Sequence, residues 1–397
     1  MDAQTSWLDV DLDIMSENIR KIKNFIGNTK MMAVVKADAY GHGLLPVALC
    51  AIEYGAEYLG VSNIEEGVFL RQNGISSPIL IFNCLLPEQA DEAVKYDLTA
   101  TVSSLDVVQA LNNKAIKMNK NVFIHLKIDT GFGRFGILPD FAVDFVKIVT
   151  STFKRVKLEG IYTHFSSATS EKTTRRQFRK FINVVEEIKA MDVNIPIKHV
   201  CNSLATIKYP EMHLDMVRVG NLIYGFCGQQ TIGTKPVGKI VSRILLLKTL
   251  PAGHNVGYDN KFITKRPTRV AIIPFGYFDG LALAVLQPEG FMQALKTFIK
   301  LIFPSICCSK ERKVKIKGKM CKIVGKIGMN NCMIDVTDLN NEVYVGDCVE
   351  ISARRVNLRY TLPRVYRNKG QIFGDLRNTS TNNKENYQEE LRRKHIG

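Results

Sequence analysis

A lysine that directly follows an apolar run has the best setting for chemistry in this 397-residue chain. Lys36 comes after the run MMAVV (31–35) and lies within the segment AVVKADAYGHG (33–43). At the end of a buried strand an amine is partly desolvated, which lowers its pKa and makes it a better nucleophile toward a carbonyl group. The same position also suits a surface lysine that begins a loop, and on the residue type alone that simpler interpretation is favoured.

Polar side chains follow several other apolar runs in the same way. Any one of them would be ordinary in a loop, because loops are polar. As a set they indicate an active site at one edge of a parallel sheet, where the carboxyl ends of the strands meet. They are Lys36, Asn83, Lys127, Arg134, His164, Ser203 and Arg218.

The elements that would position these residues are eight short apolar runs with helix-like segments between them. Several runs are continuous rather than alternating, as in strands that are buried on both faces. Amphipathic stretches at 105–118 and 178–191 are typical of the helices that cover such strands. We therefore expect an N-terminal (β/α)8 barrel over residues 1–232. The runs are 31–35, 57–61, 79–82, 99–102, 122–128, 157–163, 198–201 and 215–219.

The pattern changes after residue 232 to strand-like runs separated by turn residues, which predicts a mostly β domain over 233–370. An inserted, more hydrophobic segment lies near 281–314, and within it 291–303 has the spacing of a basic amphipathic helix. Packing on the β domain or at a dimer interface is the favoured role for this helix, and contact with an anionic membrane is the minor alternative. The polar tail 371–397 is expected to be disordered or a loose helix.

The composition narrows the class of protein. The formal charge is +16, but the only dense basic stretch is 281–320, where eight basic and two acidic residues give +6. No arginine-rich arm or zinc-finger spacing accompanies it, so we expect neither a nucleic-acid partner nor a bound metal. Nine scattered cysteines, an acidic N-terminus and no apolar run near the roughly 20 residues of a membrane span predict a cytoplasmic protein with reduced thiols.

The segment AVVKADAYGHG closely resembles the cofactor-lysine motif of alanine racemases, which are fold-type III pyridoxal-phosphate enzymes with a barrel and a β domain. Further family signatures follow in the same order, from Trp7 to about Tyr366. They are LKIDTGFGRFG (126–136), YTHFSSA (162–168), CNSLAT (201–206), VRVGN (217–221), GYDNKF (257–262), GKIGMNN (325–331) and RYTLPRVY (359–366).

The resemblance implies a role for each matched residue. Lys36 and Tyr258 would be the two catalytic bases, with Tyr258 supplied by the partner subunit of a head-to-tail homodimer. Arg134 and Met329 would bind the substrate carboxylate, and Lys127 matches a lysine that several members carboxylate. Arg218 would face the pyridine nitrogen and discourage its protonation, which limits side reactions. The residues implied in cofactor binding are Lys36, Tyr40, His164, Asn202, Ser203, Arg218, Gly220, Asn221 and Tyr360.

The implied function is interconversion of L-alanine and D-alanine with pyridoxal 5′-phosphate, which would supply D-alanine for peptidoglycan. This sequence differs from the family pattern around Met329. Many relatives have an acidic residue at the position of Asn330 and often a cysteine at the position of Gly328. These changes leave open a racemase of serine, ornithine or lysine.

Three further hypotheses remain. The GYDNKF segment argues against a decarboxylase of the same fold, and the β domain with its tyrosine argues against a non-catalytic pyridoxal-phosphate carrier. The intact set Lys36, Arg134, His164, Arg218 and Tyr258 argues against a basic interaction protein built on a decayed scaffold.

Overall fold

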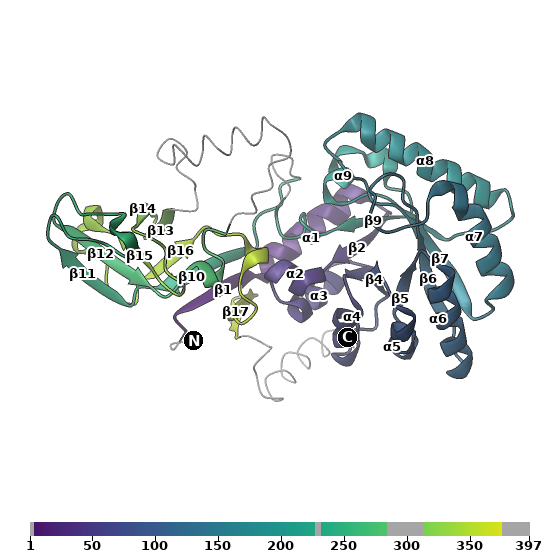
Figure 1. Ribbon diagram of the computed structural model, residues 1–397, viewed down its shortest axis with the longest axis horizontal. Coiled ribbons are helices and arrows are strands. Elements are labelled where there is room, and N and C mark those ends of the chain that lie inside the picture. The colour runs from purple at the N-terminus through teal and green to yellow at the C-terminus, as the bar shows by residue number, and fades with distance from the viewer. Residues whose placement is uncertain (1–3, 227–231, 284–312, 375–397) are drawn as a thin grey trace. The chain divides into compact units, whose positions relative to one another are not determined.

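The computed structural model describes residues 4–226, 232–283 and 313–374, which form two compact units (Figure 1). One unit is Leu12–Val237, and the other combines Met1–Asp11 with Gly238–Gly397. The boundary predicted at residue 232 had assigned the first eleven residues to the barrel. Strand β1 (Ser6–Asp11) instead pairs with β10 (Gly238–Arg243) and β17 (Arg364–Asn368). Its burial alternates from residue to residue, as in a strand with one covered face, whereas barrel strands are buried on both faces.

The first unit is built on an eight-stranded parallel sheet that curls into a barrel. Its order is β8-β7-β6-β5-β4-β3-β2-β9, and every neighbouring pair is parallel. The backbone N–H groups of Asp215 and Arg218 donate to the carbonyl oxygens of Lys198 (3.1 Å) and Cys201 (3.0 Å), which links the two end strands. The predicted barrel is confirmed. Its strands are β2 (Lys30–Val34), β3 (Tyr58–Val61), β4 (Ile79–Cys84), β5 (Thr99–Val102), β6 (Val122–Lys127), β7 (Val156–Tyr162), β8 (Ile197–His199) and β9 (Met216–Val219).

Helices follow the strands and surround them on the outside of the barrel (Figure 1). Short polar side chains mark where some of them begin, since the side chains of Asn63 and Asn202 accept hydrogen bonds from the first turns of α4 and α9. Helix α8 buries one face along its length, with Phe181, Val184 and Ile188 at helical spacing. The helices are α1 (Leu12–Ile26), α2 (Lys36–Gly41), α3 (Leu44–Glu53), α4 (Ile64–Gln72), α5 (Ala90–Lys95), α6 (Leu105–Lys117), α7 (Pro139–Thr152), α8 (Glu171–Lys189) and α9 (Ser203–Lys208).

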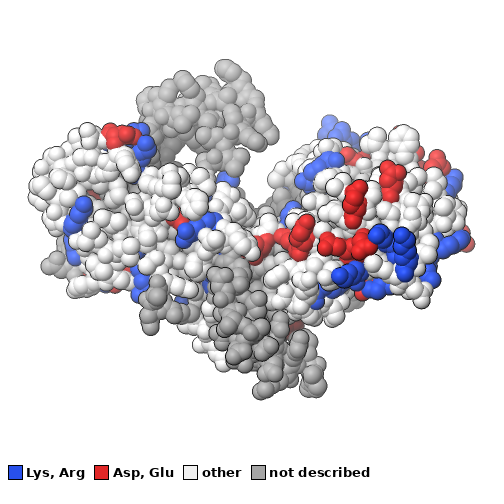
Figure 2. Space-filling view, turned by 60° about the horizontal axis from the view of Figure 1, so that its bottom comes forward, with Lys and Arg blue, Asp and Glu red and all other residues white. Residues whose placement is uncertain are grey.

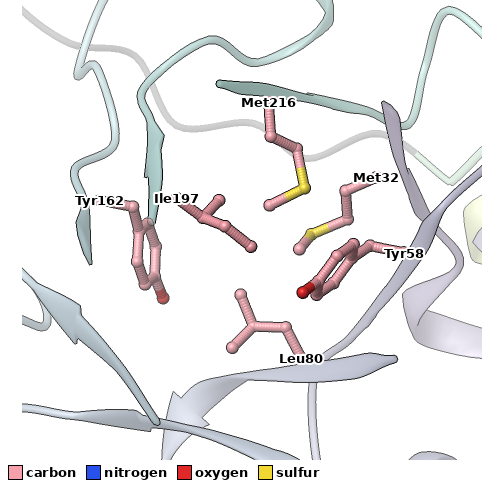
Figure 3. Close-up of a cluster of buried hydrophobic side chains, with 6 residues drawn as sticks. All are labelled: Met32, Tyr58, Leu80, Tyr162, Ile197 and Met216. Atoms are coloured by element: carbon pink, nitrogen blue, oxygen red, sulfur yellow. The ribbon is translucent and has the colours of Figure 1, made fainter. Parts of the chain in front are cut away.

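The interior of the barrel is filled by side chains from opposite strands, so it is a packed core and not a channel (Figure 3). The hydroxyl group of Tyr162 shares a hydrogen bond of 2.9 Å with that of Thr101, which satisfies both polar groups inside the core. Full burial of each large apolar side chain stabilises the fold by about 1.5–3 kcal/mol. The cluster in Figure 3 consists of Met32, Tyr58, Leu80, Tyr162, Ile197 and Met216.

The second unit is a ten-stranded, mostly antiparallel sheet, which confirms the predicted β domain. A small core of Leu250, Val256, Val270 and Val324 lies against it. Strand β18 falls within the stretch 371–397 that was predicted to be a polar tail. The rest of that tail (375–397), most of the insert (284–312) and the predicted helix 291–303 lie outside the described residues. The remaining strands are β11 (Leu246–Leu250), β12 (Thr268–Ile273), β13 (Lys313–Ile316), β14 (Lys319–Val324), β15 (Cys332–Asp335), β16 (Cys348–Ile351) and β18 (Gln371–Phe373).

Three further observations concern the surface charges, the helices and metal binding. On the face drawn in Figure 2, basic and acidic side chains of the described residues lie interspersed. None of the helices in the described ranges is both long enough and apolar enough to cross a membrane. The described residues also bring together no group of three His, Cys, Asp or Glu side chains suited to a metal ion.

Candidate active site

A cavity of about 610 Å³ opens at the carboxyl ends of the barrel strands. Its lining brings together all of the residues that the sequence singled out in the barrel, including Lys36, His164 and Ser203. Five basic side chains line it, and none of the described lining residues is Asp or Glu. Such a lining suits a ligand with several negative charges. The five are Lys36, Lys127, Arg134, Lys208 and Arg218.

Lys36 opens a turn with an unusual backbone. The four residues that follow it, Ala37–Tyr40, all have left-handed φ values of 52–55° although none is glycine. Each left-handed non-glycine residue costs roughly 1–2 kcal/mol, so surrounding contacts must hold the turn. The carboxylate of Asp38 accepts a hydrogen bond from the Leu44 N–H (2.9 Å), and the carboxylate of Glu66 accepts one from the Asp38 N–H (3.3 Å).

The amine of Lys36 is less basic than a free lysine. Burial lowers its pKa, the nearby positive charge of Arg134 lowers it further, and Glu66 partly opposes the change. A larger fraction of the amine is therefore neutral near pH 7, which is the form that attacks a carbonyl carbon or accepts a proton.

One end of the cavity is formed by neutral hydrogen-bonding groups. The Oγ atom of Ser203 accepts hydrogen bonds from the N–H groups of Gly220 (2.9 Å) and Leu222 (3.3 Å). A Cβ atom on Gly220 would lie only 2.6 Å from the hydroxyl of Tyr40, so only glycine permits this close approach. Burial raises the pKa of Tyr40, which keeps its phenol protonated as a donor. Asn202 and Asn221 also line the cavity. Hydroxyl and amide groups arranged in this way suit a phosphate.

Arg218 is held rigidly at the cavity by acceptors from neighbouring strands. Its Nη1 donates to the ring Nδ1 (2.9 Å) and the carbonyl oxygen (3.0 Å) of His199, and its Nη2 donates to the Thr163 carbonyl (2.8 Å). The Nδ1 atom of His164 lies 3.2 Å from the same Nη2. Burial lowers the pKa of Arg218 to about 10, which still leaves the guanidinium charged at neutral pH.

His164 is a neutral imidazole. Burial lowers its pKa to about 3, with further lowering by Arg218 and the other nearby cations. Because a guanidinium can only donate, Nδ1 must accept from Arg218 and the ring proton is then on Nε2. The ring is thus fixed in one tautomer.

Lys127 is buried at the end of β6, between the rings of Phe135 (5.4 Å) and Tyr162 (5.3 Å). Burial lowers its pKa to about 8, and the charges of Arg218 and Arg134 add to the effect. Arg134 itself is exposed and stacks on Phe132, with its Cζ 4.4 Å from the ring centroid.

The three other predicted site residues belong to the β unit. Tyr258 follows Gly257, which has a φ of 82°, and its side chain is 68 % exposed. The carbonyl groups of Gly328 and Met329 accept hydrogen bonds from the N–H groups of Tyr277 (3.1 Å) and Phe278 (3.0 Å), which fixes the segment around Met329. The carbonyl of Tyr360 accepts a hydrogen bond of 2.7 Å from the buried Arg364.

Sequence reasoning missed several residues that line the cavity, notably Phe82, Tyr162 and Lys208. Tyr162 stands directly before the THF motif at the end of β7, so its position was a usable signal. Lys208 lies one and a half helical turns after Ser203 in α9, and its Nζ donates to the Thr169 carbonyl (3.4 Å). Nothing in the sequence pattern distinguishes it from a surface lysine.

Comparison with known protein families identifies both parts of the chain. Residues 10–227 match the family model of the alanine racemase N-terminal domain, and residues 237–376 match that of the C-terminal domain. The chain belongs to the alanine racemase family. Alanine racemases are isomerases, and the chain is an enzyme of that class.

Curated members of the alanine racemase family align with most of the chain. The alanine racemase of Halothermothrix orenii is 38% identical over 352 residues, which cover 87% of this chain and 86% of that protein. Alanine racemase 1 of Caldanaerobacter subterraneus subsp. tengcongensis is 37% identical over 358 residues, or 88% of this chain and 86% of that protein.

Solved alanine racemase structures share the fold of both units. The alanine racemase of Clostridium difficile 630 superimposes with a TM-score of 0.83 at 28% identity, covering 95% of this chain and 100% of that one. That of Bacillus anthracis, described with bound L-Ala-P, gives a TM-score of 0.79 at 25% identity and covers 95% and 99%.

Proposed function

We propose that this chain interconverts L-alanine and D-alanine with pyridoxal 5′-phosphate as its cofactor. The observation that carries the proposal is the lining of the barrel cavity, with five basic side chains and no acidic one among the described residues. Pyridoxal phosphate brings a phosphate and a phenolic oxygen, and an amino acid brings a carboxylate. This anionic pair matches the charge of the cavity.

The residues present fit the parts of this cofactor. The amine of Lys36 would hold its aldehyde carbon, since burial has made that amine a better nucleophile. Tyr40, Ser203 and the backbone at Gly220 and Asn221 would bind the phosphate, together with Tyr360 by family resemblance. His164 and Arg218 would lie against the ring, and Arg134 would hold the phenolic oxygen and the substrate carboxylate. Asn202 adds an amide at the same end of the cavity.

When bound, pyridoxal phosphate makes the α-hydrogen of an attached amino acid acidic enough for a side chain to remove it. Racemisation then needs one proton-transfer group on each face of the α-carbon. We assign the D face to the amine of Lys36 and the L face to the phenol of Tyr258. The exposed side chain of Tyr258 is available to a second copy of the chain, in keeping with a homodimer that shares its active sites.

Arg218 and Lys127 would adjust the electrostatics of the site. The charged guanidinium of Arg218 opposes protonation of the pyridine nitrogen, because two adjacent positive charges repel. Lys127, with its pKa of about 8, holds a sizeable neutral fraction that can combine with carbon dioxide. The resulting carbamate would be an anion that pairs with Arg134, while Met329 completes the substrate pocket.

By the same family inference the product D-alanine would serve peptidoglycan synthesis in the cytoplasm. The experiment that tests the proposal is turnover of L- and D-alanine, serine, ornithine and lysine by purified protein with pyridoxal phosphate. We expect alanine to be converted in both directions, and conversion to be lost in Tyr258→Phe. Tyr344→Phe, which removes an equally exposed phenol of the β unit, is the matched control and should keep wild-type activity.

Each other outcome has a definite meaning. Conversion of another amino acid but not of alanine would move the substrate and implicate the pocket around Gly328 and Asn330. Inactivity with all five amino acids despite bound cofactor would refute the proposed function. Unchanged racemisation in Tyr258→Phe would remove Tyr258 from the mechanism.

A further inference from the structure

A chain of hydrogen bonds runs from Arg218 through the barrel interior to a carboxylate. The Nη1 of Arg218 donates to Nδ1 of His199 (2.9 Å), and Nε2 of His199 lies 2.9 Å from Nδ1 of His125. The Nε2 of His125 lies 3.2 Å from Oε2 of Glu159. Arg218 lies in β9, His199 in β8, His125 in β6 and Glu159 in β7. Of these four residues only Arg218 lines the cavity.

Because Arg218 is buried, this chain of hydrogen bonds contributes to stabilising its positive charge. Both imidazole rings are 0% exposed and Arg218 is 3% exposed, whereas Glu159 is only part-buried. Among the described residues Arg218 forms no direct ion pair with a carboxylate, and its other partners are neutral carbonyls and imidazoles. A buried charge without a counter-charge destabilises the folded protein. A carboxylate that acts on Arg218 through polarised imidazole rings therefore reduces this penalty.

The donor at one end sets the direction of every bond in the chain. A guanidinium can only donate, so Nδ1 of His199 must accept and its ring proton must be on Nε2. That proton is donated to Nδ1 of His125, which places the second ring proton on Nε2, facing Glu159. A carboxylate can only accept, so both ends demand the same orientation.

The charge states agree with this orientation. Burial lowers the pKa of both His125 and His199, and for His125 it outweighs the opposing effect of the Glu159 carboxylate, so both rings are neutral at neutral pH. Burial would raise the pKa of Glu159, but the hydrogen bond from His125, the hydrogen bond from Tyr58 and nearby positive charge together lower it, so the carboxylate is ionised at neutral pH. The chain therefore links one fixed positive charge to one fixed negative charge.

Close packing holds the two rings in place. Tyr162 stacks on His199 with centroids 4.7 Å apart, and the Cζ of Arg218 lies 5.2 Å from the same tyrosine ring. A Cβ atom on Gly160 would come within 2.6 Å of the His125 ring, so that glycine leaves the space the ring occupies. Neither imidazole can turn without displacing these neighbours.

We propose that Glu159 is a positioning residue for Arg218, acting through His125 and His199 as the remote counter-charge that fixes the guanidinium at the cavity. The inference rests on the proposed function, because that proposal places Arg218 against the cofactor ring. The hydrogen-bonded chain itself exists whether or not the protein racemises alanine.

The first test follows the side-chain nitrogen and proton signals of histidine by NMR in the full-length protein, with and without pyridoxal phosphate. We expect His125 and His199 to be neutral at neutral pH, with the proton on Nε2, because burial lowers the pKa of both rings. Glu159→Gln keeps an acceptor but removes the charge, and should shift the signals of His199, which Glu159 does not touch. The matched control is Asp215→Asn, a barrel carboxylate bound to the N–H and Nζ of Lys198 and not to this chain. It should leave both rings unchanged.

The second test is a double-mutant cycle on cofactor affinity and on the absorption spectrum of the bound cofactor. Glu159→Gln alone should weaken pyridoxal-phosphate binding by roughly tenfold, the lower end of the loss in affinity seen when an outer hydrogen-bonding partner of a metal ligand is removed. In the Arg218→Lys variant, Glu159→Gln should change pyridoxal-phosphate affinity by less than about twofold, because the guanidinium through which Glu159 acts is absent.

Three results would overturn the proposal: a His199 ring with its proton on Nδ1, His199 signals that ignore Glu159→Gln, or equal effects of that change in both backgrounds. The NMR test needs no turnover, so it separates the two proposals. A shifted His199 in a protein that racemises nothing would refute the proposed function and retain the role of Glu159 toward Arg218.

Discussion

Adding a single methyl group inside the barrel, in Gly160→Ala, should destabilise the first unit strongly. The new Cβ would lie 2.6–2.7 Å from three atoms of the His125 ring, well inside van der Waals contact. The backbone at Gly160 has a negative φ, so the replacement adds a steric conflict without backbone strain. The ring cannot retreat, because it is fully buried and bonded at both nitrogen atoms.

The magnitude follows from these contacts. Overpacking a well-filled core costs about 1–3 kcal/mol. If the ring moves, the hydrogen bond to His199 is lost as well, and an unsatisfied buried polar group costs about 1–3 kcal/mol. The free energy of unfolding should therefore fall by about 2–6 kcal/mol, which for a unit of this size corresponds to a drop in Tm of about 4–24 °C.

The assay is urea unfolding followed by circular dichroism at 222 nm, which reports mainly the barrel helices. Gly67→Ala is the control, since its Cβ would meet only carbon atoms of Leu98, at 3.0 Å or more and not a ring held by hydrogen bonds, and the helix gains from alanine. The double variant Gly160→Ala with His125→Ala should be less destabilised than the sum of its parts, because the ring that clashes is gone. A Gly160→Ala protein within about 0.5 kcal/mol of wild type, where neutral surface changes fall, would refute the reasoning.

Three further predictions concern the cavity and the acid stability of the barrel. Gly220→Ala should raise the Kd for pyridoxal phosphate by roughly 10–100-fold with little loss of stability. The reason is that the new Cβ would lie 2.6 Å from the Tyr40 hydroxyl and would push it out of place. Fluorescence titration measures the Kd. Lys127→Met should stabilise the cofactor-free protein by up to about 3 kcal/mol at pH 7, since a pKa lowered from 10.5 to about 8 disfavours the charged amine by about 1.4 kcal/mol per unit. This gain should shrink as the pH of the unfolding experiment rises above 8. Stability should also fall steeply below pH 6.5, by up to about 4 kcal/mol per pH unit, because three imidazoles are neutral when folded and protonated when unfolded. The three are His125, His164 and His199.

Each of these has a clear contrary result. Unchanged cofactor affinity in Gly220→Ala would mean that the Tyr40 end of the cavity does not hold the phosphate. A destabilised Lys127→Met protein at pH 7 would mean that the amine contributes favourable contacts that outweigh its burial. A free energy of unfolding that does not change between pH 6.5 and 5 would mean that the imidazoles have the same pKa in the folded and unfolded states.

The barrel and most of its site could be predicted because they depend on local patterns. The strand MMAVV and the residue after it are consecutive in sequence, so the location of Lys36 at a strand end follows from the pattern alone. The left-handed turn after Lys36 could not be predicted, because it contains no glycine and is held by Glu66 from another helix. Strand β1 was assigned to the wrong unit because its partners are more than 200 residues away.

The chain of hydrogen bonds from Arg218 to Glu159 could not be predicted from the sequence, for a different reason. His125, Glu159 and His199 lie inside strands, where a sequence pattern distinguishes only buried from exposed positions. Their contact depends on the register between strands, which pairs His125 with Gly160 and Tyr162 with His199. The relative shift of parallel strands in a barrel is set by closure of the whole sheet and not by any local signal.

Burial, with the nearby positive charges added to it, explains how one cavity can hold both a fixed charge and reactive amines. Burial lowers the pKa of Lys36 and of Lys127 toward neutrality, and the positive charge of nearby arginines lowers both further, whereas arginine starts so high that burial still leaves Arg218 charged with a pKa of about 10. A bound anion must reverse this effect, because it stabilises the protonated amines. Binding of inorganic phosphate to the cofactor-free protein should thus take up protons near pH 8, and Lys127→Met should reduce the uptake. Calorimetry in two buffers of different ionisation enthalpy measures the number of protons, and binding without uptake would show that the phosphate does not sense these amines.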